Sequence, residues 1–201
     1  MQLTEHDYER VAAAIRAAEQ QTAAEIVCVL ARRSSDYAYV PPLWAAFAAL
    51  AAPWPLMLLT DLSMRMIFAA QIAVFIVAAL AISWAPLRFL LTPRSIKRTR
   101  AHRAAIEQFY SRNVAATKDR TGVLIFVSMA ERYVRIVADD GVVARIADEE
   151  WRAAIDLLLA HMPRGEIADG FIDAIGECAR LLARHIPPGG RDELPDKIYF
   201  M

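Results

Sequence analysis

The sequence predicts an α/β fold, a small mixed β-sheet sandwiched by helices, with a transmembrane helical hairpin inserted into it. The first observation is a pair of apolar segments without a charged residue, residues 37–60 and 66–87, joined by a short polar link. About 20 apolar residues cover the hydrocarbon core of a bilayer, so each segment is long enough to span it. The second observation is that one short run rich in β-branched residues precedes the hairpin and two follow it. The first run is too short to form a domain of its own, so we expect all three in one sheet.

This organisation divides the chain into three parts. Residues 1–36 and 93–186 are expected to form a discontinuous α/β domain. Residues 40–91 are expected to form the hairpin, with spans at about 40–59 and 66–87, and residues 187–201 a C-terminal tail. The 57% hydrophobic content exceeds that of a typical soluble domain, and the hairpin accounts for the excess. The 23 acidic and 23 basic residues balance and no nucleic-acid-binding motif is present, so we expect no nucleic-acid partner.

The chain before the hairpin predicts a helix and a buried strand. Thr4 is a suitable helix cap, and the apolar residues that follow it recur at spacings of three and four: Tyr8, Val11, Ile15 and Ala18. Residues 25–30 are almost continuously apolar and rich in β-branched side chains, which is typical of a strand buried on both faces.

The hairpin itself has the character of an anchor. Pro53 and Pro55 each remove a backbone donor, so the first span should kink or end there. Gln71 is the only strongly polar side chain of the second span, and we expect it to form a hydrogen bond across the hairpin. Neither span carries an ionisable group near its centre, which argues against a transport pathway.

The distribution of basic residues predicts the orientation in the membrane. Six basic residues follow the second span (Arg88, Arg94, Lys97, Arg98, Arg100 and Arg103), whereas the link carries one acid and one base. The positive-inside rule then places both termini and the domain in the cytoplasm. These basic residues either form a solvated face that fixes the topology or also attract anionic lipid headgroups, at about 1 kcal/mol each.

The second half of the domain is predicted to contain two strands and two helices. Residues 123–128 form a continuous apolar run and residues 133–138 alternate, so the first strand is buried and the second has one solvated face. A helix is expected from Asp148 and another over about residues 166–185. Residues 198–201 either dock on the domain or form a frayed end.

The sequence contains two kinds of side chain that could react or bind a metal, namely paired aspartates and cysteines. Asp139 and Asp140 are adjacent at the end of a strand, where carboxylates suit Ca²⁺ or Mg²⁺ but also serve as turn and cap residues. Cys28 and Cys178 lie in apolar patterns and are expected to be buried free thiols. No nucleophile motif of a hydrolase or phosphatase is present in the sequence.

The segment from Thr121 to Ser128, followed by Glu131-Arg132, Val134-Arg135-Ile136 and the turn Asp139-Asp140-Gly141, resembles the TPM domain family. Glu25-Ile26-Val27 is similar to the first strand of that family, and the resemblance covers residues 1–36 and 93–186. It resembles in particular a bacterial membrane branch in which two spans interrupt the domain, which implies a bacterial inner-membrane protein.

Some members of this family are described as acid phosphatases with an acidic metal pocket. The resemblance therefore implies a Ca²⁺ or Mg²⁺ ligand set, which comprises Glu25, Asp139, Asp140, Asp148 and Asp169. Two features depart from the family pattern. Aspartates precede Gly141 where a glycine-rich turn is common, and Ala24 stands where glycine is frequent.

Two functions follow from these observations. The first is a non-catalytic, membrane-anchored module that binds a partner, either another membrane protein or a second copy of the chain, and helps assemble or maintain a membrane complex. The alternative is a metal-dependent phosphatase tethered to the membrane.

Overall fold

The computed structural model describes residues 3–189 and 193–201 and divides the chain into two compact units. One unit combines Met1–Ser34 with Arg98–Met201 and forms the α/β domain; the other is Ser35–Lys97 and forms the helical hairpin.

The domain is built on a four-stranded mixed sheet. Its strands are β1 (Glu25–Ala31), β2 (Gly122–Ser128), β3 (Tyr133–Ala138) and β4 (Ile198–Phe200). The strand order is β3-β2-β1-β4, with β1 parallel to both β2 and β4, and β3 antiparallel to β2. The predicted small mixed sheet is confirmed. The two central strands are buried along their whole length, as their continuous apolar sequences require.

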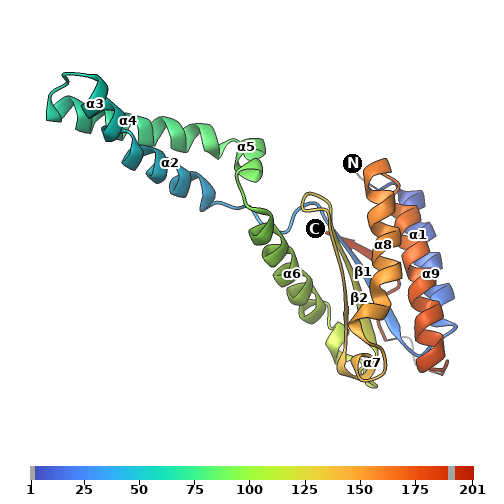
Figure 1. The fold of residues 1–201 in the computed structure, drawn as a ribbon. Helices are drawn as coiled ribbons and strands as arrows, with labels where there is room; N and C mark the ends of the chain where they lie inside the picture. The colour runs from blue at the N-terminus through green and yellow to red at the C-terminus, as the bar shows by residue number, and fades with distance from the viewer. Residues whose placement is uncertain (1–2, 190–192) are drawn as a thin grey trace. The chain divides into compact units, whose positions relative to one another are not determined.

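Helices cover both faces of this sheet, as Figure 1 shows. On one face lie α1 (Glu5–Glu19), α8 (Arg152–His161) and α9 (Ile167–His185), and on the other lies α6 (Arg94–Ser111), followed by the 3₁₀ turn η1 (Val114–Ala116). Side chains alternate between the two faces along each strand. Ile26 and Cys28 therefore pack under α1 and α9, while Val27 and Val29 pack under α6.

Local sequence signals explain where α1 and the shorter elements begin. Thr4 and Asp7 form a capping box at the start of α1, with the Asp7 carboxylate accepting from the Thr4 backbone N–H at 2.9 Å. Asp139 caps a short helix, α7 (Asp140–Val143), which the sequence did not predict. The helix expected from Asp148 starts as a 3₁₀ turn, η2 (Asp148–Trp151), before α8. A further 3₁₀ turn, η3 (Met162–Arg164), separates α8 from α9.

The end of the chain docks on the domain as β4. The Arg32 N–H donates to the Met201 carbonyl at 2.7 Å, and the Met201 N–H donates to the Leu30 carbonyl at 3.0 Å. Ile198 is buried in the core next to these bonds. Of the two alternatives for residues 198–201, docking is the one observed.

The hairpin unit consists of two long apolar segments with breaks at prolines. The first is α2 (Val40–Ala51) followed by α3 (Pro53–Leu59), so the predicted break at Pro53 is confirmed. The second is α4 (Met64–Ser83), which ends earlier than the predicted residue 87 and is followed by α5 (Ala85–Leu90). Pro86 explains the earlier end, because a proline inside a helix lacks the N–H and clashes with the carbonyl four residues before it.

Candidate functional site

A cavity of the domain opens at the carboxyl ends of β1, β2 and β4. It has a volume of about 330 Å³ and is lined by both apolar and charged side chains: Leu3, Asp7, Leu30, Arg32, Met129, Gly165, Glu166, Ile167, Ala168, Asp169 and Phe200. The carboxyl ends of parallel strands are the usual place for a ligand in α/β proteins, because loops and helix ends converge there. No pattern in the sequence predicted this cavity.

The acidic side chains of this cavity are largely engaged within the protein. Hydrogen bonds from Thr4 lower the pKa of Asp7. The Arg10 guanidinium lies 2.5 Å from the Asp169 carboxylate and 3.8 Å from that of Asp7, so it links α1 to α9. Glu166 pairs with Arg164 at 3.5 Å. The cavity therefore has the size for a small ligand but offers few unpaired acids to bind a cation.

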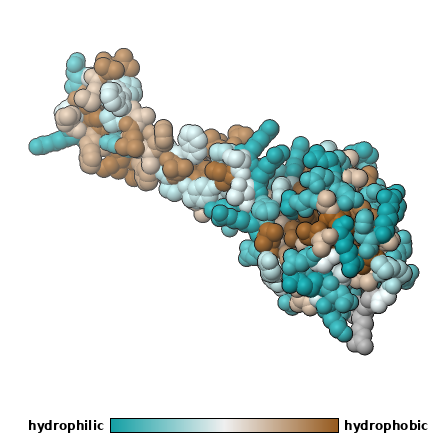
Figure 2. All heavy atoms as spheres, turned by 60° about the horizontal axis from the view of Figure 1, so that its bottom comes forward, coloured by the Kyte–Doolittle hydropathy of each residue, from teal (hydrophilic) through white to brown (hydrophobic). Residues whose placement is uncertain are grey.

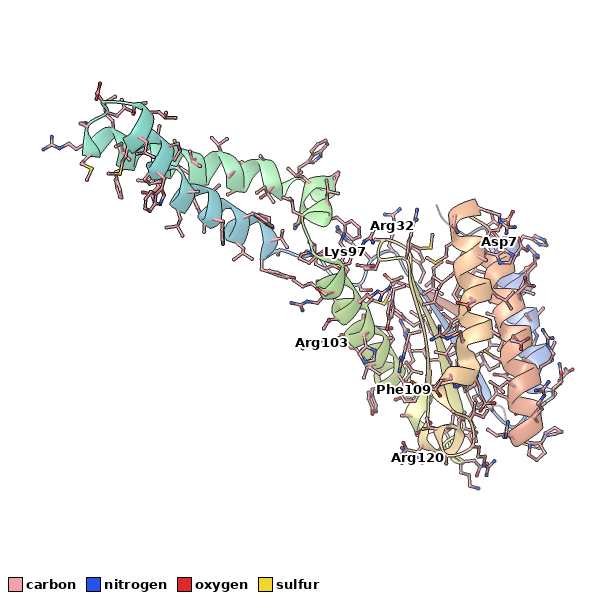
Figure 3. The ribbon with its side chains drawn as sticks, in the orientation of Figure 1. Asp7, Arg32, Lys97, Arg103, Phe109 and Arg120 are labelled. Atoms are coloured by element: carbon pink, nitrogen blue, oxygen red, sulfur yellow. The ribbon has the colours of Figure 1, made fainter. Side chains whose placement is uncertain are left out.

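The opposite end of the sheet carries three of the five predicted metal ligands. Glu25 stands in register with Gly122, and the Asp139 N–H donates to the Gly122 carbonyl at 2.9 Å. Glu25 and Asp139 thus flank the first residue of β2, with Asp140 next in sequence. Figure 3 shows Arg120 at this end of the domain and Arg32 at the other.

A single arginine engages both aspartates of this edge. The Arg120 guanidinium lies 2.9 Å from the Asp139 carboxylate and 2.9 Å from that of Asp140. The hydrogen bond to Asp139 raises the pKa of Arg120 above its ordinary value, so the guanidinium stays charged. The Asp139 side chain is only 3% exposed, and one of its oxygens caps the Asp140 N–H at 2.7 Å. Its other oxygen, Oδ2, has no hydrogen-bond partner in the described structure.

Glu25 fastens the C-terminal tail. Its carboxylate accepts the backbone N–H groups of Glu193 and Leu194, each at 3.2 Å. A small polar cavity beside it, lined in part by Glu25, Asp119 and Thr121, has a volume of about 10 Å³. A space of this size holds about one water molecule.

The other two predicted ligands lie elsewhere. Asp148 pairs with Arg135 of the edge strand β3 at 3.2 Å, and Asp169 belongs to the cavity at the opposite end of the sheet. Within residues 3–189 and 193–201, no group of three or more His, Cys, Asp or Glu side chains is arranged to hold a metal ion. Hard cations need several oxygen ligands, and a guanidinium already bridges the two aspartates. The five predicted ligands are therefore not gathered into one site in the described part of the chain.

Arg120 was missed by the sequence analysis, although a signal for it existed. Two adjacent aspartates beside a buried strand require a counter-charge, and Arg120 directly precedes the segment that enters β2. Its positive φ of 53° turns the chain there, a conformation that sequence alone does not indicate for arginine.

The basic residues predicted to lie at the membrane surface belong to α5 and α6. Arg88 is in α5, and the other five are in α6: Arg94, Lys97, Arg98, Arg100 and Arg103. Arg94, Arg98, Arg100 and Arg103 are exposed. Lys97 is half-buried, with its ammonium 3.7 Å from the centre of the Phe89 ring.

The hairpin presents an almost wholly exposed apolar surface. Val40–Leu59 and Met64–Ser83 are each long and apolar enough to cross a membrane. Their most apolar windows are only 11% and 6% buried, and Leu58 and Leu80 are exposed by 80% and 70%. Figure 2 shows hydrophobic side chains gathered over this unit, whereas hydrophilic ones cover most of the visible face of the domain.

Comparisons with known proteins agree with the architecture. The family model described as the TPM domain matches residues 69–181, more than half of the chain. The NMR structure of the BA42 protein from the psychrophilic bacterium Bizionia argentinensis is similar, with a TM-score of 0.62 and 18% sequence identity. That similarity covers 100% of this chain and 97% of that one, and at this identity it supports the fold alone. No curated protein matches the sequence. On the strength of the family match, the chain belongs to the TPM domain family.

Proposed function

We propose that the chain is a bacterial inner-membrane protein whose hairpin anchors a non-catalytic TPM domain at the cytoplasmic face. There the domain binds a partner and helps assemble or maintain a membrane protein complex. The observation that carries this proposal is the exposed apolar surface of α2, α3 and α4.

The exposed apolar area of the hairpin is larger than is usual for a monomeric soluble protein. Isolated exposed apolar residues are normal, but a monomeric soluble protein rarely exposes a contiguous patch of more than a few hundred Å². Most of the large apolar side chains on the two long segments are exposed, and Phe47, Leu50, Phe68 and Val77 are each more than 60% exposed. The hydrocarbon core of a bilayer suits such an apolar surface. Helices can lie in it because their backbone N–H and C=O groups form hydrogen bonds within the helix.

The non-catalytic part of the proposal rests on how the acidic groups are used. Asp139 and Asp140 both pair with Arg120, and Glu25 binds backbone N–H groups of the tail. Each of these carboxylates therefore has a structural partner.

Membrane anchoring is tested by fractionating cells that express the full chain. We expect the protein in the membrane pellet after a carbonate wash at high pH, which removes peripheral proteins. A variant with residues 40–91 replaced by a short Gly/Ser linker should move to the soluble fraction. Wild-type protein in the soluble fraction would refute the anchor.

The orientation has a separate test. A reporter that is active only in the periplasm should be active when inserted in the link of residues 60–65 and silent at the C-terminus. The reverse pattern would place the domain outside the cytoplasm.

The alternative function, a metal-dependent phosphatase, is favoured by one observation, the buried Oδ2 of Asp139 that lacks a partner. We expect detergent-purified protein supplied with Mg²⁺ or Ca²⁺ not to hydrolyse a generic phosphomonoester above the rate of a mock preparation. Asp139→Asn and Asp140→Asn are the matched variants, one buried and one exposed. Turnover that is present in the wild type and lost in both variants would establish the phosphatase instead.

A further inference from the structure

A lateral groove runs along the hairpin between its two long segments. It has a volume of about 370 Å³, and its lining is almost entirely apolar: Ala46, Ala49, Leu50, Phe68, Gln71, Ile72 and Phe75. Two small side chains of α2, Ala46 and Ala49, and two aromatic side chains of α4 line it. Phe68 and Phe75 are 64% and 38% exposed.

The one polar side chain of this groove has no partner within the described chain. Gln71 was predicted to form a hydrogen bond across the hairpin, yet within residues 3–189 and 193–201 no hydrogen bond or ion pair involves its carboxamide. Its position explains this, because the neighbouring segment offers only alanine and leucine side chains at that level. In hydrocarbon, an unpaired carboxamide is unfavourable, since no water is available to replace the missing hydrogen bonds.

The spacing on α4 places Gln71 between two aromatic residues on one flank of the helix. Phe68 lies three residues before it and Phe75 four residues after it, so all three side chains share a face. This flank of α4 therefore presents two exposed aromatic rings beside a groove that also contains small side chains. Between the rings lies a carboxamide that can both donate and accept hydrogen bonds.

We infer that the groove is the contact surface for a second copy of this chain, and that the two Gln71 carboxamides pair with each other across a two-fold axis. The inference rests on the proposed insertion of the hairpin in the membrane. A two-fold interface apposes the same surface on both copies, so a self-complementary group at its centre is satisfied by its own counterpart. A lipid acyl chain fills the groove but gives the carboxamide no hydrogen-bond partner. Small residues and a polar side chain are features of contacts between membrane helices.

Disulfide cross-linking of the full chain in native membranes tests this inference. Ile72→Cys places a thiol on the groove flank, and Val77→Cys places one on the opposite flank of α4, where Val77 is 65% exposed. Cys28 and Cys178 are buried, so the wild type serves as the background control. With a mild oxidant, we expect a dimer from Ile72→Cys and little from Val77→Cys or the wild type.

The carboxamide is tested by adding Gln71→Leu to Ile72→Cys. Leucine keeps the size and apolar packing but removes both hydrogen bonds, so the dissociation constant of the dimer should rise about tenfold. Gln71→Asn should restore part of the dimer because it keeps the carboxamide.

The outcomes separate this inference from the proposed anchor. Membrane-bound protein that cross-links equally at both positions, not at all, or only to a different protein would overturn the inference and leave the anchor intact. An unchanged dissociation constant in Gln71→Leu would likewise overturn the role of the carboxamide. Protein found in the soluble fraction would overturn both.

Discussion

Replacing Gly122 with alanine is expected to destabilise the domain strongly. A Cβ at Gly122 would lie 2.1 Å from the Val114 carbonyl oxygen and 2.8 Å from the Val114 Cγ1. The closest atom belongs to the backbone, so a side-chain rotation cannot relieve the clash. Overpacking typically costs about 1–3 kcal/mol, and this contact belongs at the upper end, at about 3 kcal/mol.

The position of Gly122 explains why the strain would spread. Gly122 begins the central strand β2, in register with Glu25 of β1, and its carbonyl accepts the Asp139 N–H. Moving η1 away to accommodate a methyl group would loosen Val114, which is fully buried under α6. Both ends of this contact therefore belong to the core.

A matched substitution is available at Gly176. This glycine is exposed in the interior of α9, and an added Cβ would meet no atom within 4 Å. Gly176→Ala should therefore stabilise the protein by up to about 1 kcal/mol through helix propensity. Thermal unfolding of the two variants in detergent should give melting temperatures on opposite sides of the wild type. A Gly122→Ala protein that melts with the wild type would contradict the contact with Val114.

The strands were predictable because burial leaves a simple pattern. The runs at residues 25–30 and 123–128 are almost entirely apolar and do not alternate with polar residues. This pattern is typical of strands that are covered on both faces. Residues 133–138 alternate because β3 is an edge strand with one partly solvated face. The mixed sheet followed from these three runs and the hairpin between them.

Side-chain pairing was much less predictable, because it depends on which elements meet in space. Glu25 and Asp139 lie on opposite sides of Gly122, but more than 100 residues separate them in sequence. The ion pair of Arg10 with Asp169 links α1 to α9, and no local pattern at either residue indicates it. The five carboxylates implied by the family resemblance share a residue type, whereas their surroundings in the fold differ.

The C-terminal tail also pairs with side chains that are distant in sequence, and one of these contacts shifts the pKa of a glutamate. Glu19 at the end of α1 is half-buried and accepts the Ile26 N–H at 2.8 Å. Burial, together with a hydrogen bond to the Asp196 carboxyl of the tail, raises the pKa of Glu19 to about 9. At neutral pH the Glu19 carboxyl is therefore protonated in the folded protein, although glutamate has an ordinary pKa near 4.5.

The sign of the resulting pH dependence follows from proton binding. Between pH 4.5 and 9 the folded state holds a proton on Glu19 that the unfolded state has released. The contribution of this group to stability is therefore complete below pH 4.5 and is lost progressively as the pH rises towards 9. Because Glu19 is partly exposed to solvent, we expect the free energy of unfolding to fall by about 2 kcal/mol over this range, less than the full shift in pKa implies.

Glu19→Gln should remove this loss. A glutamine keeps the acceptor for the Ile26 N–H, supplies a permanent N–H donor to Asp196, and does not ionise. The variant should equal the wild type near pH 5 and exceed it by about 2 kcal/mol near pH 9, as measured by unfolding in detergent at a series of pH values. Glu9→Gln, on the exposed face of the same helix, should leave the pH dependence unchanged. If the free energy of unfolding depends on pH in the same way for Glu19→Gln and the wild type, Glu19 and Asp196 do not share a proton in the folded protein. The attachment of the tail would then rest on its other contacts, among them those of Glu25 and the pairing of β4 with β1.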